Sequence, residues 1–170
     1  MSYSTSQSKP SSNYFDEIYQ SMPTGEKLIE HSDFVVFGEV IGIEILKMKV
    51  TYEPSVNIED LYTVSKFKIT TSYKGKLKTG DVIKVAQRGD NDTRISRAIS
   101  ENGGYFKKND KLILFLFQDS NDRPYFTINQ NQSQFWINSD NLVFYGKNPN
   151  DNLFLNIKTL NDFEKIFITK

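Results

Sequence analysis

Most of the chain carries the hydrophobic pattern of β-strands. From Asp33 to Val50 apolar and β-branched side chains are dense, and successive positions alternate between two faces, as in an extended strand. Gly38 and Gly42 interrupt this run, which a helix would tolerate poorly. Because glycines inside a strand mark a bend or a close approach of another backbone, the first strand is predicted to be long and sharply coiled.

A second long strand is expected over residues 61–73, after a polar loop at residues 53–60. Its apolar parity changes from Tyr62 and Val64 to Phe67 and the residues beyond it, and a β-bulge produces such a change of phase. Long strands that are bent by glycines or bulges allow a small sheet to curl into a barrel. The two strands together therefore predict a curled sheet.

The segment YKGKLKTGDVIKV, Tyr73–Val85, contains four lysines and two glycines between two apolar runs. Gly75 and Gly80 can adopt a positive φ, so the segment is first of all a turn. Leu77 is the one apolar residue between the glycines, and it is predicted to fold back over the open end of the barrel. The lysines between the two runs are expected to stay in water: Lys74, Lys76 and Lys78.

Shorter strands are predicted in quick succession along the rest of the chain: residues 82–87, 111–117, 124–130, 134–138, 141–146 and 153–157. Residues 111–117 are apolar on both parities, so both faces of this strand must be covered. Helices at the two ends of the chain are expected to cover one face, with Thr24 and Thr159 as candidate N-caps. These helices are predicted over residues 13–22, 25–32 and 160–170.

Together these elements predict a single mainly-β domain over residues 13–170. Its expected form is a small OB-like, closed or partly open β-barrel with short N- and C-terminal helices. Residues 1–12 are polar and serine-rich, and they are expected to form a disordered leader. The longest polar insertion covers residues 89–104, and a loop of this length is either functional or mobile.

Charge is balanced over the whole chain but not along it. The 170 residues carry 21 Lys and Arg against 21 Asp and Glu, which argues against a dedicated nucleic-acid binder. Residues 61–111, however, hold 12 basic against 5 acidic residues. Strand parity places several of these cations on one face, which is either a site for an anionic polymer or a solvated surface that discourages strand pairing. The candidate basic face comprises Lys66, Lys68, Lys84, Arg88, Arg94 and Arg97.

Three aromatic residues are candidate stacking partners for nucleotide bases: Tyr125, Trp136 and Tyr145. Exposed rings on which bases stack are a common feature of proteins that bind single-stranded nucleic acids. The parity of Trp136 is opposite to that of its apolar neighbours Phe135 and Ile137, so its ring faces the other side of the strand. Packing beneath the terminal helices is the alternative for all three rings.

Residues of common catalytic and metal sites are sparse. The chain has no cysteine, and its single histidine, His31, falls at the end of a predicted helix, where it faces the C-terminal dipole. The paired carboxylates Glu59–Asp60 and Asp90 with Asp92 lie in predicted polar loops, where ordinary pKa values are expected. We therefore expect a non-enzymatic protein without a metal or cofactor. No apolar run approaches the roughly 18 residues of a membrane span.

Three motifs occur in a recognisable order: SDFVVFGEVIGIE, YTVSKFKITTSYKGKLKTGDVIKV and FKKNDKLILFLF. They resemble the first strand, the second strand with its lysine–glycine turn, and a later strand of bacterial secreted and lipoprotein domains of unknown function. Asn109 stands where glycine is usual. The resemblance covers Glu30 to Phe144 in outline, and it implies a fold and an extracytoplasmic setting but no catalytic residue.

The same pattern is distantly similar to the netrin-like module of tissue inhibitors of metalloproteinases, which is a five-stranded OB barrel. That module depends on an N-terminal cysteine and on disulfides. This chain contains no cysteine, so inhibition through a metal-chelating N-terminus is not carried over.

The expected function is that of a non-enzymatic extracytoplasmic binding or interaction domain, the soluble part of a bacterial lipoprotein. The serine-rich leader resembles the tether of such proteins, although a cytoplasmic chain with a polar start is the alternative. A second expectation is a binder of single-stranded nucleic acid or another anionic polymer through the basic face. The candidate partners are another cell-surface protein and an anionic polymer.

Overall fold

The computed structural model describes residues 21–53, 56–89, 104–129, 132–141, 143–145, 154 and 156–168. Its elements are α2 (Gly25–His31), β1 (Phe34–Glu53), β2 (Val56–Lys74), β3 (Val82–Arg88), β4 (Lys111–Phe117), β5 (Tyr125–Thr127), β6 (Gln134–Ile137), β7 (Val143–Tyr145) and α4 (Leu160–Ile168). The prediction of a mainly-β fold with short helices is confirmed. The predicted leader lies outside the described residues, as do most of the helix over 13–22 and of the insertion over 89–104.

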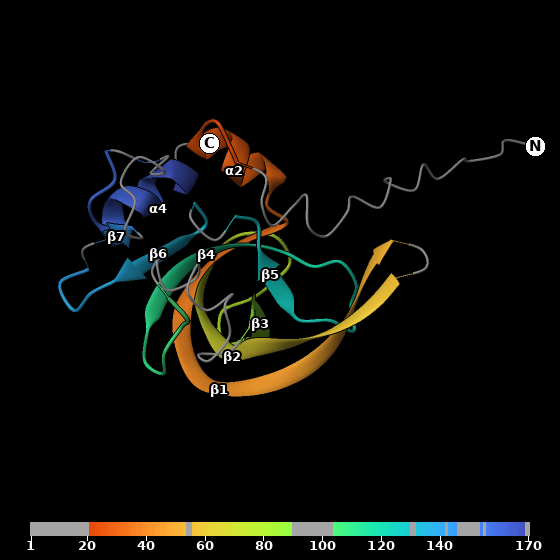
Figure 1. Ribbon diagram of the computed structural model, residues 1–170. Helices are drawn as coiled ribbons and strands as arrows, with labels where there is room; N and C mark the ends of the chain where they lie inside the picture. Colours follow the sequence, from red (N-terminus) through yellow and green to blue (C-terminus); the bar gives the residue numbers. More distant parts are fainter. Residues whose placement is uncertain are drawn as a thin grey trace, which may run out of the picture.

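Five of the strands pair side by side in a closed ring (Figure 1). β1 pairs with β2 and β2 with β3, both antiparallel, whereas β3 lies parallel to β5. β5 is antiparallel to β4, and β4 returns to the first part of β1, which closes the ring. β6 pairs with the first half of β4 and β7 pairs with β6, so these two strands extend the sheet beyond the ring.

β1 and β2 form one long hairpin, which curves around the molecule in Figure 1. The polar loop predicted at residues 53–60 is wrong, because β1 continues to Glu53 and β2 resumes at Val56. The backbone ladder runs through this polar stretch, with Thr51 paired to Asn57 and Glu53 to Val56. The apolar phase of β2 changes for another reason than a bulge: Tyr62 and Val64 join one buried cluster, whereas Phe67 and Ile69 join the other. Register shifts that leave an extra residue in β2 do occur farther along, at Thr70 and Tyr73, and a third shift leaves Ile41 of β1 as the extra residue.

Gly38 supplies the close backbone approach that its place in the strand predicts. A Cβ atom at this position would overlap the carbonyl oxygen of Lys68 and would lie 2.8 Å from Cε1 of Phe67. At Gly42 a Cβ atom would come no closer than 3.6 Å, to Cδ of Lys66. The first glycine is therefore required by packing against β2, whereas the second occupies a site with room for a side chain.

Two clusters of buried apolar side chains lie on opposite faces of the ring strands. The inner core faces the inside of the ring and contains Phe34, Val36, Val40, Phe67, Ile69, Ile83, Val85, Phe106, Leu112, Leu114 and Leu116. The outer core joins Ile113, Phe115 and Phe117 of β4 to Leu28 of α2 and Phe163 of α4. Alternate residues of β4 enter different cores, so the prediction that both of its faces are covered is confirmed.

Helix α2 and the lysine–glycine turn agree with their predictions except at Lys74. Thr24 caps α2 by accepting a hydrogen bond from the Lys27 amide at 3.2 Å, and Leu77 packs against the inner core. Gly75 and Gly80 have φ values of 94° and 91°. Lys74 was expected in water, but its ammonium group donates to the carbonyls of Ile29 at 2.7 Å and Glu30 at 3.1 Å. It thereby satisfies carbonyls at the C-terminal end of α2.

The C-terminal helix begins with a reciprocal cap. The Asp162 amide donates to Oγ1 of Thr159 at 3.1 Å, and Oδ2 of Asp162 accepts from the Thr159 amide at 3.1 Å. The strand predicted over residues 153–157 is wrong in its described residues, because the Ile157 amide donates to the Phe154 carbonyl in a turn. The turn places the ring of Phe154 in the outer core, where it stacks on Phe115. No helix in the described ranges is long and apolar enough to cross a membrane.

Candidate ligand-binding groove

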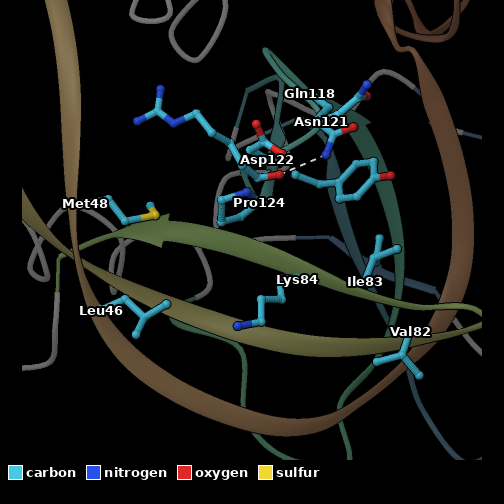
Figure 2. Close-up of a pocket in the computed structure, with 11 residues that line it drawn as sticks. Leu46, Met48, Val82, Ile83, Lys84, Gln118, Asn121, Asp122 and Pro124 are labelled. Atoms are coloured by element: carbon cyan, nitrogen blue, oxygen red, sulfur yellow. Dashed lines mark hydrogen bonds between the residues drawn. The ribbon is translucent and has the colours of Figure 1, made fainter.

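A surface groove with a volume of about 500 Å³ lies between β1, β3 and the β4–β5 connection. Figure 2 shows Leu46 and Met48 of β1 and Lys84 of β3 on one side, with the β4–β5 connection opposite them. Apolar and hydrogen-bonding groups are mixed along its walls. The lining residues are Leu46, Met48, Val82, Ile83, Lys84, Gln118, Asn121, Asp122, Arg123, Pro124 and Tyr125.

The long hairpin and the β4–β5 connection build the groove together. β1 coils beyond the bulge at Ile41, so its next residues of one parity, including Leu46 and Met48, turn toward β3. Arg123 then fastens the connection to β1, because its guanidinium donates to Oδ2 of Asp119 at 2.7 Å and to the carbonyl of Lys49.

The side-chain amide of Gln118 gives the connection a fixed shape. Its Nε2 donates to the carbonyl of Arg123 at 2.8 Å, the hydrogen bond marked in Figure 2. The wall opposite β3 is therefore held both by this internal hydrogen bond and by the contact of Arg123 with β1. A wall supported in this way is preorganised, which lowers the entropy cost of binding a ligand.

The floor of the groove carries an ion pair. Nζ of Lys84 lies 2.7 Å from Oε1 of Glu44, and both side chains are partly exposed. The hydrogen bond from Lys84 holds the pKa of the Glu44 carboxyl below its ordinary value of 4.5, against the opposing effect of burial, and Lys66 adds to the lowering. The charge of Lys84 is therefore compensated within the groove, and a ligand meets a polar floor rather than an isolated cation.

The structure brings part of the predicted basic face together. Lys66 lies directly opposite Lys84 in the β2–β3 ladder and Lys68 follows on the same face, and both β2 lysines are exposed. Arg88 is instead bound to Asp60, with Nη2 2.6 Å from Oδ2. The two remaining members of the predicted face, Arg94 and Arg97, lie outside the described residues.

The three predicted aromatic residues do not converge. Tyr125 lines the groove and meets Phe34 edge to face at 5.2 Å between ring centroids. Burial, with a smaller contribution from Asp81, raises the pKa of its hydroxyl above 10.0. Trp136 lies in β6, where its ring packs edge-on against Phe106 and its Nε1 donates to Asp110 at 3.3 Å.

Tyr145 belongs to β7, where it pairs with Phe135 of β6, and its side chain is outside the described residues. Since β6 and β7 extend the sheet beyond the ring, neither Trp136 nor Tyr145 borders the groove, which β1, β3 and the β4–β5 connection line. Of the predicted site residues whose side chains the structure describes, Lys84 and Tyr125 are the ones among its lining residues.

Most of the groove was not predicted from the sequence. The apolar pair Leu46 and Met48 on one parity of a polar hairpin arm was the available signal on β1. The Asn-Asp-Arg-Pro turn at residues 121–124 was the signal on the opposite wall. Neither signal shows that the two segments meet, because their proximity depends on the curvature of β1.

His31, the single histidine, is exposed at the last position of α2. Within the ranges that the structure describes, no three side chains of His, Asp or Glu are placed to hold a metal ion. Comparison with protein-family models, curated proteins and solved structures found no match. The resemblance to secreted and lipoprotein domains, and through them to netrin-like modules, therefore stays a prediction.

Proposed function

We propose that this protein is a non-enzymatic binding module that holds its ligand in the groove between β1, β3 and the β4–β5 connection. The observation that carries the proposal is the construction of this groove. Its walls are fixed by Arg123 and Gln118, its floor is charge-compensated, and Leu46, Met48 and Tyr125 offer apolar surface. Apolar walls with a few oriented polar groups are typical of ligand sites.

The order of the ring strands supports an OB-like interpretation. OB folds are five-stranded Greek-key barrels that bind ligands on the face of strands 2 and 3 and through the loops between strands 1–2 and 4–5. The groove lies beside β3 and the β4–β5 connection, which is the corresponding place in this chain. The likeness is one of topology, and an argument from topology supports a binding site without naming its ligand.

Photocrosslinking tests whether the groove is the contact site. A benzophenone amino acid in place of Asn121, on the groove wall, should give a discrete adduct in cells of the source organism. The same amino acid in place of Asp140, exposed in the β6–β7 turn, is the matched control and should give none. Equal adducts at both positions, or no adduct at position 121, would refute contact through the groove.

We also propose an extracytoplasmic location, as the soluble part of a lipoprotein. The support is the resemblance of the sequence motifs and of the serine-rich leader to such proteins. In fractionated source cells, an antibody against the domain should detect it in the membrane fraction. Protease added to intact spheroplasts should degrade it. Protection of the protein until the spheroplasts are lysed would place it in the cytoplasm and contradict the proposal.

A second candidate function is binding of single-stranded nucleic acid or another anionic polymer. The exposure of Lys66 and Lys68 beside Lys84 favours it, whereas the ion pairs of Lys84 with Glu44 and of Arg88 with Asp60 weaken the field of this face. A labelled oligothymidine should then bind with an affinity that falls as salt rises.

Two variants test this alternative: one removes positive charge from the basic face, and the control removes a positive charge elsewhere. Lys66→Gln with Lys68→Gln should reduce the slope of log affinity against log salt by about one to two, since each phosphate contact contributes about 0.7 for single strands. Lys165→Gln, on α4, should leave the slope unchanged. Absence of binding at low salt, or the same loss with Lys165→Gln, would eliminate this candidate.

A further inference from the structure

The second edge of β1 is open over its middle part. β1 is paired with β2 along one edge from Val35 to Glu53, but its other edge is paired with β4 only as far as Glu39. The last contacts on that edge join Val40 to the turn before β4: the Val40 amide donates to Asp110 at 2.9 Å, and the Asn109 amide donates to Val40 at 2.8 Å. Among the described strands, none pairs with this edge beyond that point.

The open segment ends where Arg123 reaches the carbonyl of Lys49. Residues 41–48 therefore form the accessible length, which is about the length of one ordinary strand. An unpaired strand edge presents a row of backbone donors and acceptors to which another strand can add.

An apolar stripe runs along one face of this open segment. Ile41, Ile43 and Ile45 are 41%, 43% and 50% exposed. Ile43 and Ile45 alternate in the regular ladder, so their side chains project from the same face of the sheet, and Ile41 precedes them as the extra residue of the bulge. The opposite parity includes Leu46 and Met48, which line the groove. Three exposed isoleucines in a row are unusual on a solvated strand, and exposed apolar surface of this kind marks contact sites.

Lysines bracket the stripe at both ends. Lys47 and Lys49 follow it along β1 and are exposed. At the other end, the turn that contacts Val40 carries the exposed lysines Lys107 and Lys108, and exposed Lys111 follows as the first residue of β4. A strand added to this edge thus meets isoleucines in its middle and positive charge at each end.

We propose that the open edge of β1 accepts an extended segment of another protein, with alternating apolar residues at its centre and acidic residues at both ends. The apolar residues would cover Ile41, Ile43 and Ile45, and the acidic residues would lie near the bracketing lysines. Backbone hydrogen bonds to residues 41–48 would supply affinity, and the side chains would supply specificity. This edge adjoins the groove, since the side chains of Leu46 and Met48 line it, but the proposed contacts are to the backbone and the isoleucines of β1, so the inference goes beyond the proposed function.

A second copy of the chain fits this edge less well. Antiparallel self-pairing centred on Ile43 would drive the partner strand past Val40 into the turn that holds Asn109. Centring the pair on Ile45 avoids that turn, but it sets Lys47 opposite Ile43 and Lys49 opposite Ile41. This second arrangement leaves both lysines without acidic partners, whereas an acidic segment neutralises them.

The test uses the full chain and a fluorescein-labelled peptide of about ten residues, with alternating valine and threonine at its centre and two aspartates at each end. Fluorescence anisotropy should show saturable binding below about 1 mM. Ile43→Lys should weaken binding at least about tenfold. The matched control Ile168→Lys changes an isoleucine that is 78% exposed on α4 and should bind as the wild type does. A peptide with lysines in place of the aspartates should not bind.

Amide hydrogen exchange gives an independent readout at the backbone. Bound peptide should slow exchange within residues 41–48 and leave residues 160–168 of α4 unchanged. Three results would overturn the proposal: no binding of the acidic peptide, equal binding by Ile43→Lys, or equal binding of the lysine-flanked peptide. Sedimentation of the protein alone is the remaining measurement. A concentration-dependent dimer that Ile43→Lys abolishes would assign the edge to a second copy and would also overturn it.

Discussion

Replacement of Gly38 by alanine tests whether the close approach of β1 to β2 requires a glycine at this position. The new Cβ atom would overlap the Lys68 carbonyl oxygen and lie 2.8 Å from Cε1 of Phe67. Neither neighbour can move freely, because Lys68 belongs to the β1–β2 ladder and the Phe67 side chain is fully buried. The strands must separate locally to make room for the methyl group.

The expected magnitude follows from two opposing effects. Overpacking of a tight site costs about 1–3 kcal/mol or more, and contact with backbone atoms places Gly38→Ala at the upper end of that range. The reduced entropy of the unfolded chain offsets about 0.4–1 kcal/mol of this loss. We therefore expect the free energy of unfolding to fall by about 2–3 kcal/mol, or Tm by about 4–12 °C for a chain of this size.

Gly42→Ala is the control within the same strand. Its Cβ atom would lie 3.6 Å from the nearest heavy atom, the flexible Cδ of Lys66, so only the entropy effect remains and stability should stay within about 1 kcal/mol of the wild type. Both variants are compared by urea and thermal unfolding followed by far-UV circular dichroism. The reasoning is refuted if Gly38→Ala is as stable as the wild type or if both variants lose equal stability.

Three further predictions concern packing, pH and chain attachment. Phe115 is fully buried in the outer core, so Phe115→Ala should lower the free energy of unfolding, measured by urea denaturation, by about 3–5 kcal/mol. A loss below about 1 kcal/mol, as for a surface substitution, would contradict this. Hydrogen bonds from the Thr159 side chain and nearby amides lower the pKa of Asp162. Because the folded-state pKa is depressed, Asp162 stabilises the protein above its ordinary pKa of 3.8, and this stabilisation is lost as the pH falls below that value. The free energies of unfolding of the wild type and Asp162→Asn should therefore converge at low pH. A difference that stays constant with pH would contradict the prediction. The Gln132 side chain accepts a hydrogen bond from the Met22 amide at 2.7 Å and donates one to the Met22 carbonyl at 3.1 Å, which attaches the N-terminal segment to the core. Gln132→Leu should therefore speed hydrogen exchange of the Met22 amide while the α4 amides stay unchanged. An unaltered exchange rate at Met22 would contradict this attachment.

Local signals in the sequence predicted the elements better than their relations in space. The strand over residues 111–117 was predicted within its observed bounds, because apolar residues on both parities leave few alternatives. The cap at Thr159 was likewise predictable, since it depends on residues within one helical turn. The loop at 53–60 was wrong because a polar hairpin arm and a polar loop have similar composition.

The candidate site was harder to predict than the fold. Lys66, Lys68 and Lys84 were correctly placed on one face, because strand parity and antiparallel neighbours are readable from the sequence. The acidic residues that compensate two of the cations could not be predicted. Glu44 reaches Lys84 from β1, across β2, and Asp60 reaches Arg88 from the neighbouring strand β2. The groove depends on the curvature of β1, which two glycines indicate but do not quantify.

The parallel pairing of β3 with β5 gives the ring a seam. In the described residues this junction consists of Val85 beside Tyr125 and Ala86 beside Phe126, while β1 and β2 are paired over most of their length. Short junctions between segments distant in sequence form late in folding and open at low cost. Thermal fluctuation would thus open the ring beside β5, which is also paired with β4 at only two positions. Such an opening parts the Tyr125 side of the groove from β3 while the long hairpin stays intact.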